Sequence, residues 1–247
     1  MITPPKSFIF IIFLFTHIFL PTNAAAGDSV IESAIKARRS IVHIFAFQTQ
    51  FFGSARASAL LDPASGKMLI ARNMKTLHAQ KMGAGVIIDP AGMVVTNLHT
   101  VKFATELAVV LHDGTVLSGK ILHLLPEHDL VLVKIDPPSP LEAIPFADSD
   151  AVQLGDAVIN IGSSELLKET ISGGRITRLG TIDTPDGPKV ELIQVNIDLY
   201  KGDSGGPLLN REGALIGMIA AKLKNQNKAT LAIPANKIKI LCSEHLP

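Results

Sequence analysis

The sequence is poor in cysteine and has no tract of one charge, and both absences exclude whole classes of protein. Cys242 is the only cysteine among 247 residues, so no internal disulfide can hold the fold together. We interpret this residue as a small buried hydrophobe on a terminal helix. The formal net charge is +1 with no basic run, so neither nucleic acid nor an acidic membrane surface is indicated as a partner.

Metal and cofactor motifs are missing as well. No group of histidine, cysteine and carboxylate residues stands at metal-ligand spacing, and no glycine-rich loop of the phosphate-binding kind is present. We therefore expect no metal ion and no cofactor. Any chemistry would have to come from the side chains of the protein itself.

Long apolar runs are confined to the N-terminus, which has the three parts of a secretory signal peptide. A positively charged start precedes an almost wholly apolar run at 8–20, and an Ala-Ala-Ala cleavage site follows at 24–26. This run is shorter than the roughly 20 residues that a membrane-spanning helix needs. We expect residues 1–26 to be removed on export, to the periplasm or outside the cell. Membrane association is expected only if this segment stays uncleaved.

From residue 83 onward, short β-prone runs alternate with turn signals such as DPAG, HDG, PDGP and NREG. Many short strands at such intervals favour an all-β sandwich or barrel. The proline-rich stretch DPPSP divides the β-region near its middle, and stiff segments of this kind often join domains. The expected units are a first barrel at about 40–136, a linker at 137–144, a second barrel at about 145–233 and a C-terminal helix at 235–242.

Residues 48–81 differ from the rest, because they are polar, small and positively charged and lack strand alternation at their ends. We interpret them as a long insertion after a first strand at 40–47, with room for a hairpin of its own. Two roles stay open for this insertion: a lid or regulatory loop, or a tolerated surface insertion.

A glycine-built loop surrounds Ser204 in the stretch NIDLYKGDSGGPLLN. Serine catalysis needs an imidazole base, a carboxylate that orients this base, and N–H groups that receive the oxyanion. Glycines let a backbone turn its amides inward without Cβ clashes. The N–H groups of Gly202, Asp203 and Ser204 are therefore the expected oxyanion donors. The alternative is a plain tight turn between two strands.

His99 is the best candidate base among the eight histidines. It follows the apolar strand MVVTN at a strand end, whereas the others lie in turns, strand patterns, the insertion or the termini. Asp129 precedes the apolar run LVLVKID, where we expect its carboxylate to be buried and to orient the imidazole. His128 is a rival base, but neighbours on a strand point to opposite faces.

Three segments, VVTNLHTV, EHDLVLVKID and DLYKGDSGGPLLN, resemble in order and character the catalytic segments of trypsin-like serine proteases. The stretches GAGVIIDPAGMVVTN, LGDAVINIG and LAIPANKI are similar to the HtrA/Deg branch of that family. The likeness covers about residues 40–240. It implies an all-β fold of two six-stranded antiparallel β-barrels with short flanking helices and an active site between the barrels.

The resemblance also implies roles for individual residues. Ser204 would attack the peptide carbonyl, His99 would act as general base and then as general acid, and Asp129 would hold the imidazole. The expected function is that of an exported serine endopeptidase acting on unfolded or exposed protein segments. The alternative is a protease-fold chaperone-like or binding protein with a latent site. Expected partners are protein or peptide substrates, and the chain would be a monomer or a homotrimer.

The sequence departs from the HtrA pattern at its end and beside the serine. HtrA-type proteins usually carry C-terminal PDZ domains, and none is expected here, because the protease domain fills 27–247. Asp203 stands where HtrA members usually have asparagine. A buried carboxylate at this position would need a cation or several N–H donors.

A third departure is Asp198, which occupies the register of the residue at the base of the primary specificity pocket in trypsin-like enzymes. A carboxylate there would favour substrates with Arg or Lys before the scissile bond. Lys222 follows the strand IGMIAA, which should wall the same pocket, and could neutralise Asp198. Three outcomes stay open: a preference for basic residues, a neutralised pocket for small or aliphatic residues, or an Asp198 side chain outside the pocket.

Overall fold

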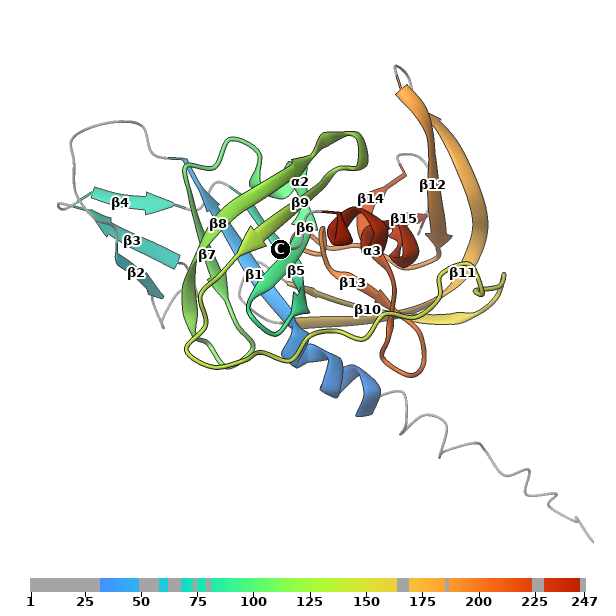
Figure 1. Ribbon diagram of the computed structural model, residues 1–247, viewed down its shortest axis with the longest axis horizontal. Coiled ribbons are helices and arrows are strands. Elements are labelled where there is room, and N and C mark those ends of the chain that lie inside the picture. The colour runs from blue at the N-terminus through green and yellow to red at the C-terminus, as the bar shows by residue number, and fades with distance from the viewer. Residues whose placement is uncertain are drawn as a thin grey trace, which may run out of the picture.

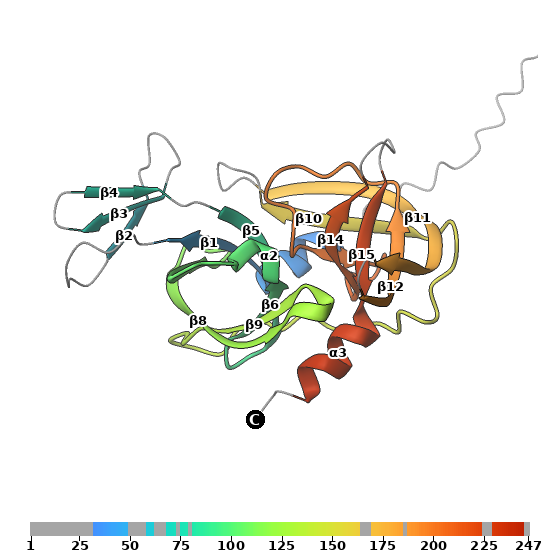
Figure 2. The same ribbon diagram turned by 90° about the horizontal axis from the view of Figure 1, so that it is seen from above.

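The protein folds, in a computed structural model, into two closed β-barrels that stand side by side (Figures 1 and 2). Each barrel has six antiparallel strands, which confirms the expected fold class. The expected signal peptide at 1–26 lies outside the described residues. The structure describes residues 32–48, 58–61, 68–72, 75–78, 81–163, 169–184, 187–223 and 229–244.

The first barrel closes in the order β1-β5-β6-β9-β8-β7. Its strands are rich in Val and Ile, β-branched residues that pack well on a pleated surface. Their bounds are β1 (Ile41–Phe47), β5 (Lys81–Asp89), β6 (Met93–Asn97), β7 (Glu106–Val110), β8 (Val116–Leu125) and β9 (Leu130–Lys134). Short helical turns interrupt this barrel at α2 (Leu98–Val101), between β6 and β7, and at η2 (Pro126–His128), between β8 and β9.

The second barrel closes in the order β10-β11-β12-β15-β14-β13. A helix, α3 (Ala235–Ser243), follows its last strand, and Cys242 of this helix is buried as expected. The strands are β10 (Ala157–Ser163), β11 (Glu169–Thr184), β12 (Gly187–Val195), β13 (Pro207–Leu209), β14 (Leu215–Lys222) and β15 (Thr230–Pro234).

The insertion between β1 and β5 contains a small antiparallel sheet of its own, in the order β2-β3-β4. Its strands are β2 (Ser58–Leu61), β3 (Met68–Arg72) and β4 (Lys75–His78). The sheet lies beside the first barrel, on the side away from the second (Figures 1 and 2). The expected local structure is therefore present, with one strand more than a hairpin.

Separate hydrophobic clusters fill the two barrels, and a third cluster joins them. Successive residues of β10 show the division: Val158 packs inside the second barrel, while Ile159 and Ile161 belong to the cluster that also contains Val86 and Val95 of the first barrel. Alternation along a strand produces this result, because neighbouring side chains point to opposite faces. Both faces of the central strands are thus buried, and the barrels share one interface.

Residues 32–37 and η1 (Arg38–Ser40) precede the first barrel as helical turns. Ala34 and Ala37 are buried in the cluster between the barrels. Among the described residues, no helix combines the length and the apolar character that crossing a membrane requires.

Candidate active site

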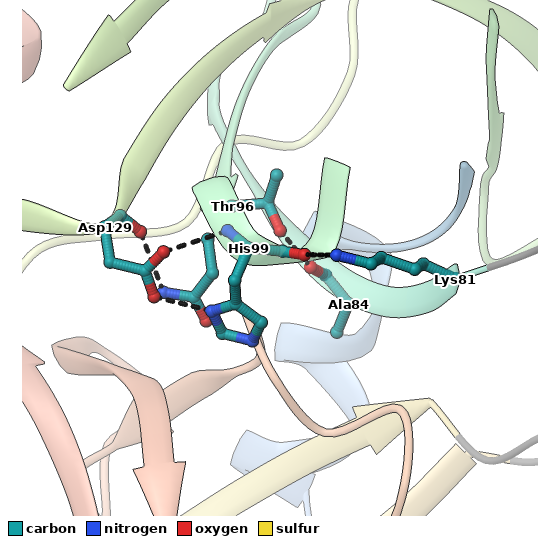
Figure 3. A network of polar contacts seen from close by, with 6 residues as sticks. Lys81, Ala84, Thr96, His99 and Asp129 are labelled. Atoms are coloured by element: carbon teal, nitrogen blue, oxygen red, sulfur yellow. Dashed lines mark hydrogen bonds and ion pairs between the residues drawn. The ribbon is translucent and has the colours of Figure 1, made fainter. Parts of the chain in front are cut away.

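His99 and Asp129 are joined by two hydrogen bonds at the edge of the first barrel (Figure 3). Nδ1 of His99 lies 2.6 Å from Oδ2 of Asp129, and the backbone N–H of His99 donates to Oδ1 at 2.9 Å. The backbone of Asp129 is tied down as well, because its carbonyl oxygen accepts the N–H of Leu98 at 2.9 Å and the Nδ2 of Asn97 at 3.2 Å. The carboxylate thus fixes both the ring and the peptide of the histidine.

The conformation of Asp129 explains how it reaches this position. Its φ of 51° lies in the left-handed region, directly after the turn η2 and before β9. Non-glycine residues adopt this region rarely, and such outliers gather at functional sites. The expectation of a buried carboxylate is wrong, since 38% of the side chain is exposed. Asp129 ends a turn at the barrel rim and does not lie within the buried strand that follows.

Two other described histidines, His128 and His43, have lowered pKa values. His128, the rival base, has a pKa lowered by burial and by the nearby ammonium of Lys237 on α3. His43 is buried on β1, and desolvation lowers its pKa to about 4. Both shifts favour a neutral ring held in a structural setting.

The loop that carries Ser204 is shaped by two glycines with positive φ, Gly202 at 109° and Gly205 at 82°. It docks on both barrels. The carbonyl oxygen of Ser204 accepts the N–H of Ala84 on β5 at 2.8 Å, and the N–H of Gly205 donates to Ile219 of β14 at 3.0 Å. The loop therefore bridges the barrel that bears His99 and the barrel that bears Ser204, and β13 follows it.

Gly83 shows how closely the serine loop approaches the histidine segment. A Cβ at Gly83 would lie 2.5 Å from Cγ2 of Thr100 and 2.8 Å from the carbonyl oxygen of Ser204. Thr100 is the neighbour of His99 in α2, so the segments that carry His99 and Ser204 meet over this glycine. Within the described residues, however, the hydroxyl of Ser204 makes no hydrogen bond to His99. Catalytic hydrogen bonds are often long until substrate binds.

Asp203 is fully buried, and the turn around it supplies a backbone donor that the sequence could not identify. The N–H of Tyr200 donates to Oδ2 of Asp203 at 2.7 Å, and the N–H of Asp203 donates to the carbonyl oxygen of Tyr200 at 3.1 Å. We expected a cation or several N–H donors to compensate this buried carboxylate, and the N–H of Tyr200 is one such donor. Because the N–H of Asp203 is engaged in this turn, it is not directed toward an oxyanion.

Asp198 and Lys222 form an ion pair, with Nζ of Lys222 2.8 Å from Oδ1 of Asp198. Both side chains are a little under half exposed. Lys222 ends β14, the strand that also holds Gly205. The internal contact that the sequence offered as one of three outcomes is therefore formed.

The family model of the trypsin-like peptidase domain matches residues 83–218, more than half of the chain. The chain belongs to the trypsin-like peptidase family. Known proteins confirm the expected HtrA-type branch of this family. The periplasmic serine endoprotease DegP of Salmonella typhimurium is 38% identical over 167 residues, which cover 66% of this chain and 35% of DegP.

Two further matches cover most of this chain. A probable periplasmic serine protease do/HhoA-like of Haemophilus influenzae is 34% identical over 230 residues, covering 91% of this chain and 47% of that protein. A solved HtrA-type protease with a tripeptide has the same fold, with a TM-score of 0.70 and 22% identity, over 87% of this chain and 62% of the other. The chain spans about a third of the length of DegP and about half of the length of the Haemophilus influenzae protein.

Proposed function

We propose that the protein is an exported serine endopeptidase that hydrolyses unfolded or exposed protein segments. The observation that carries this proposal is the doubly hydrogen-bonded pair of His99 and Asp129, set beside a glycine-built loop that bears Ser204. Export is supported by the signal-peptide pattern at 1–26 and by relatives named as periplasmic proteases.

The pair sets the tautomer that serine catalysis requires. With Nδ1–H of His99 donating to Asp129, the lone pair of Nε2 is free to take the hydroxyl proton of Ser204. Oγ then attacks the peptide carbonyl carbon, and the carbonyl oxygen becomes an oxyanion. The imidazolium gives its proton to the departing amine, and water repeats these steps on the acyl-enzyme to release the carboxylic acid.

The oxyanion would be received by the N–H groups of Gly202 and Ser204. Neither group has a backbone acceptor among the described residues, and the positive φ of Gly202 suits an inward-turned amide. The N–H of Asp203, an expected assistant, would first have to leave Tyr200. Loss of one oxyanion donor costs roughly 10²–10³-fold in rate in such sites.

A second candidate is a protease-fold protein whose site is latent until a partner or substrate binds. The observation that favours it is the missing hydrogen bond between Ser204 and His99 in the described part of the chain. Mature protein treated with a fluorophosphonate probe and with unfolded casein separates the candidates, with Ser204→Ala as the matched control. Labelling and cleavage that vanish in the variant support the peptidase. A folded wild-type protein that does neither would refute it.

For specificity, we propose a neutralised pocket that takes small or aliphatic side chains. The contact between Lys222 and Asp198 supports this choice, because the ammonium occupies the carboxylate that a substrate Arg or Lys would need. Exposed ion pairs contribute only about 0–1 kcal/mol to stability. The consequence of the pair is therefore charge neutralisation and not reinforcement of the fold.

Peptide libraries cleaved by wild type, Lys222→Met and Asp198→Asn test the pocket. The first variant bares a carboxylate and should gain cleavage after Arg and Lys. The second leaves a cation and should reject those residues as wild type does. A wild type that prefers basic residues, and loses the preference in Asp198→Asn, would show that the pair opens to substrate.

A further inference from the structure

The segment that carries His99 is held at both ends by Phe47 and Lys81, the two residues between which the insertion leaves and rejoins the first barrel. The insertion leaves β1 after Phe47 and rejoins the barrel at Lys81, the first residue of β5. The carbonyl oxygen of Phe47 accepts the N–H of Thr105 at 2.8 Å and its hydroxyl at 3.2 Å. At the other end, Nζ of Lys81 donates to the carbonyl oxygen of His99 at 2.7 Å (Figure 3).

The length of α2 explains why the bond from Lys81 matters. This helix has only four residues, and the carbonyl groups of a last helical turn have no partner within the helix. The carbonyl of His99 is one of these groups. A charged ammonium is among the strongest donors that such an oxygen can receive, so Lys81 holds the peptide from which the imidazole projects.

We propose that Lys81 is a positioning residue for His99 and so for proton transfer in the proposed peptidase. Asp129 fixes the ring and the backbone N–H of His99, whereas Lys81 of β5 fixes the backbone carbonyl of the same residue. The inference rests on the proposed function, because it assigns His99 the role of general base. The alternative is that Lys81 has no positioning role and only adds a positive charge to the surface, since its side chain is exposed.

The alternatives differ in what a substitution changes. Lys81→Met removes the ammonium and keeps most of the apolar stem. The positioning role predicts a fall in kcat of about tenfold with KM nearly unchanged, because displacements of up to about 1 Å at a reacting group cost up to about 10²-fold. Lys81→Arg retains a donor for the carbonyl and should restore most of kcat.

Lys102→Met is the matched control. Lys102 follows α2 directly, and its ammonium lies 5.2 Å from the centroid of the Phe103 ring. Removing it deletes the same charge from the same neighbourhood without touching the carbonyl of His99. This control should retain wild-type kcat, and the melting temperatures of all three variants should match that of wild type.

The measurements are kcat and KM on a casein-derived peptide, with the rate of fluorophosphonate labelling as a second readout of Ser204 activation. Wild-type kcat in Lys81→Met, an equal loss in Lys102→Met, or failure of Lys81→Arg to recover would overturn the positioning role. If the wild-type protein is itself not labelled, the proposed function falls and this inference falls with it. If wild type is labelled and Lys81→Met is equally active, only the positioning role is lost.

Discussion

Gly205 offers the sharpest test of how the serine loop is held, because a side chain there would collide with the first barrel. A Cβ built on Gly205 would lie 2.2 Å from the carbonyl oxygen of Ala84 and 2.4 Å from Oγ1 of Thr96. The hydroxyl of Thr96 already donates a hydrogen bond to the carbonyl oxygen of Ala84 at 2.6 Å, and both residues are buried. Neither contact can be relieved by swinging a flexible side-chain end aside.

The size of the effect follows from these distances. Real Cβ contacts essentially never fall below 3.0 Å, so the loop and β5 must separate by about 0.8 Å in Gly205→Ala. Ser204 is the adjacent residue, and its carbonyl is the atom that Ala84 holds. A displacement near 1 Å at a reacting group costs on the order of 10²-fold in rate. We expect labelling of Ser204 by a fluorophosphonate to slow by about that factor.

Gly114→Ala separates this collision from backbone strain. Gly114 has a φ of +86°, close to the +82° of Gly205, but nothing lies within 4 Å of its Cβ position. Left-handed backbone costs an alanine about 1–2 kcal/mol, so both variants should lose a few degrees of melting temperature. Only Gly205→Ala should lose labelling. If both variants are labelled at the wild-type rate and melt alike, the docking of the loop on Ala84 does not position Ser204.

Three further predictions concern buried polar groups. Burial lowers the pKa of His43 to about 4 from its ordinary 6.5, so the unfolded chain binds the proton more readily than the folded protein does. We therefore expect the free energy of unfolding to fall by up to about 3 kcal/mol as the pH is lowered from 6.5 through 4. Urea unfolding of wild type and His43→Leu across this range checks it, since equal pH slopes would remove His43 as the cause. Burial raises the pKa of the Cys242 thiol to about 12, so it should react with a disulfide reagent only after unfolding, and prompt labelling of the native protein would contradict this. Both amide atoms of Asn160 are buried without a protein partner in the described part of the chain, so Asn160→Leu should raise the melting temperature by a few degrees, and a lower one would show that the amide is satisfied.

The two-barrel fold could be predicted because its signals are local. Turn residues and β-prone runs recur along the chain, and the segments around His99, Asp129 and Ser204 keep their family order. The contact between His99 and Asp129 is present in the structure, and their catalytic roles stay predictions. What the pattern missed was the exposure of Asp129, because a left-handed residue after a 3-10 turn leaves no mark in the periodicity of the strand that follows it.

The backbone donor to Asp203 could not be predicted for a different reason. Every residue except proline carries an N–H, so the identity of Tyr200 says nothing about which backbone group meets the carboxylate. Lys81 was missed on similar grounds, since a long flexible side chain can reach many acceptors. In the insertion, the sequence left room for a hairpin but did not indicate a third strand, because a small sheet beside a barrel need not show the alternation of a strand with one buried face.

The proposed catalytic geometry depends on the interface between the barrels more than on either barrel alone. His99 and Asp129 come from one barrel and Ser204 from the other, and the serine loop is tied to both, through Ala84 of β5 and Ile219 of β14. Met218, the neighbour of Ile219, belongs to the apolar cluster between the barrels. A packing change in that cluster would therefore reach the serine loop through β14 without altering any residue of the site. Because packed cores respond to the loss of even one methylene, a small truncation in this cluster should already be felt at the serine loop.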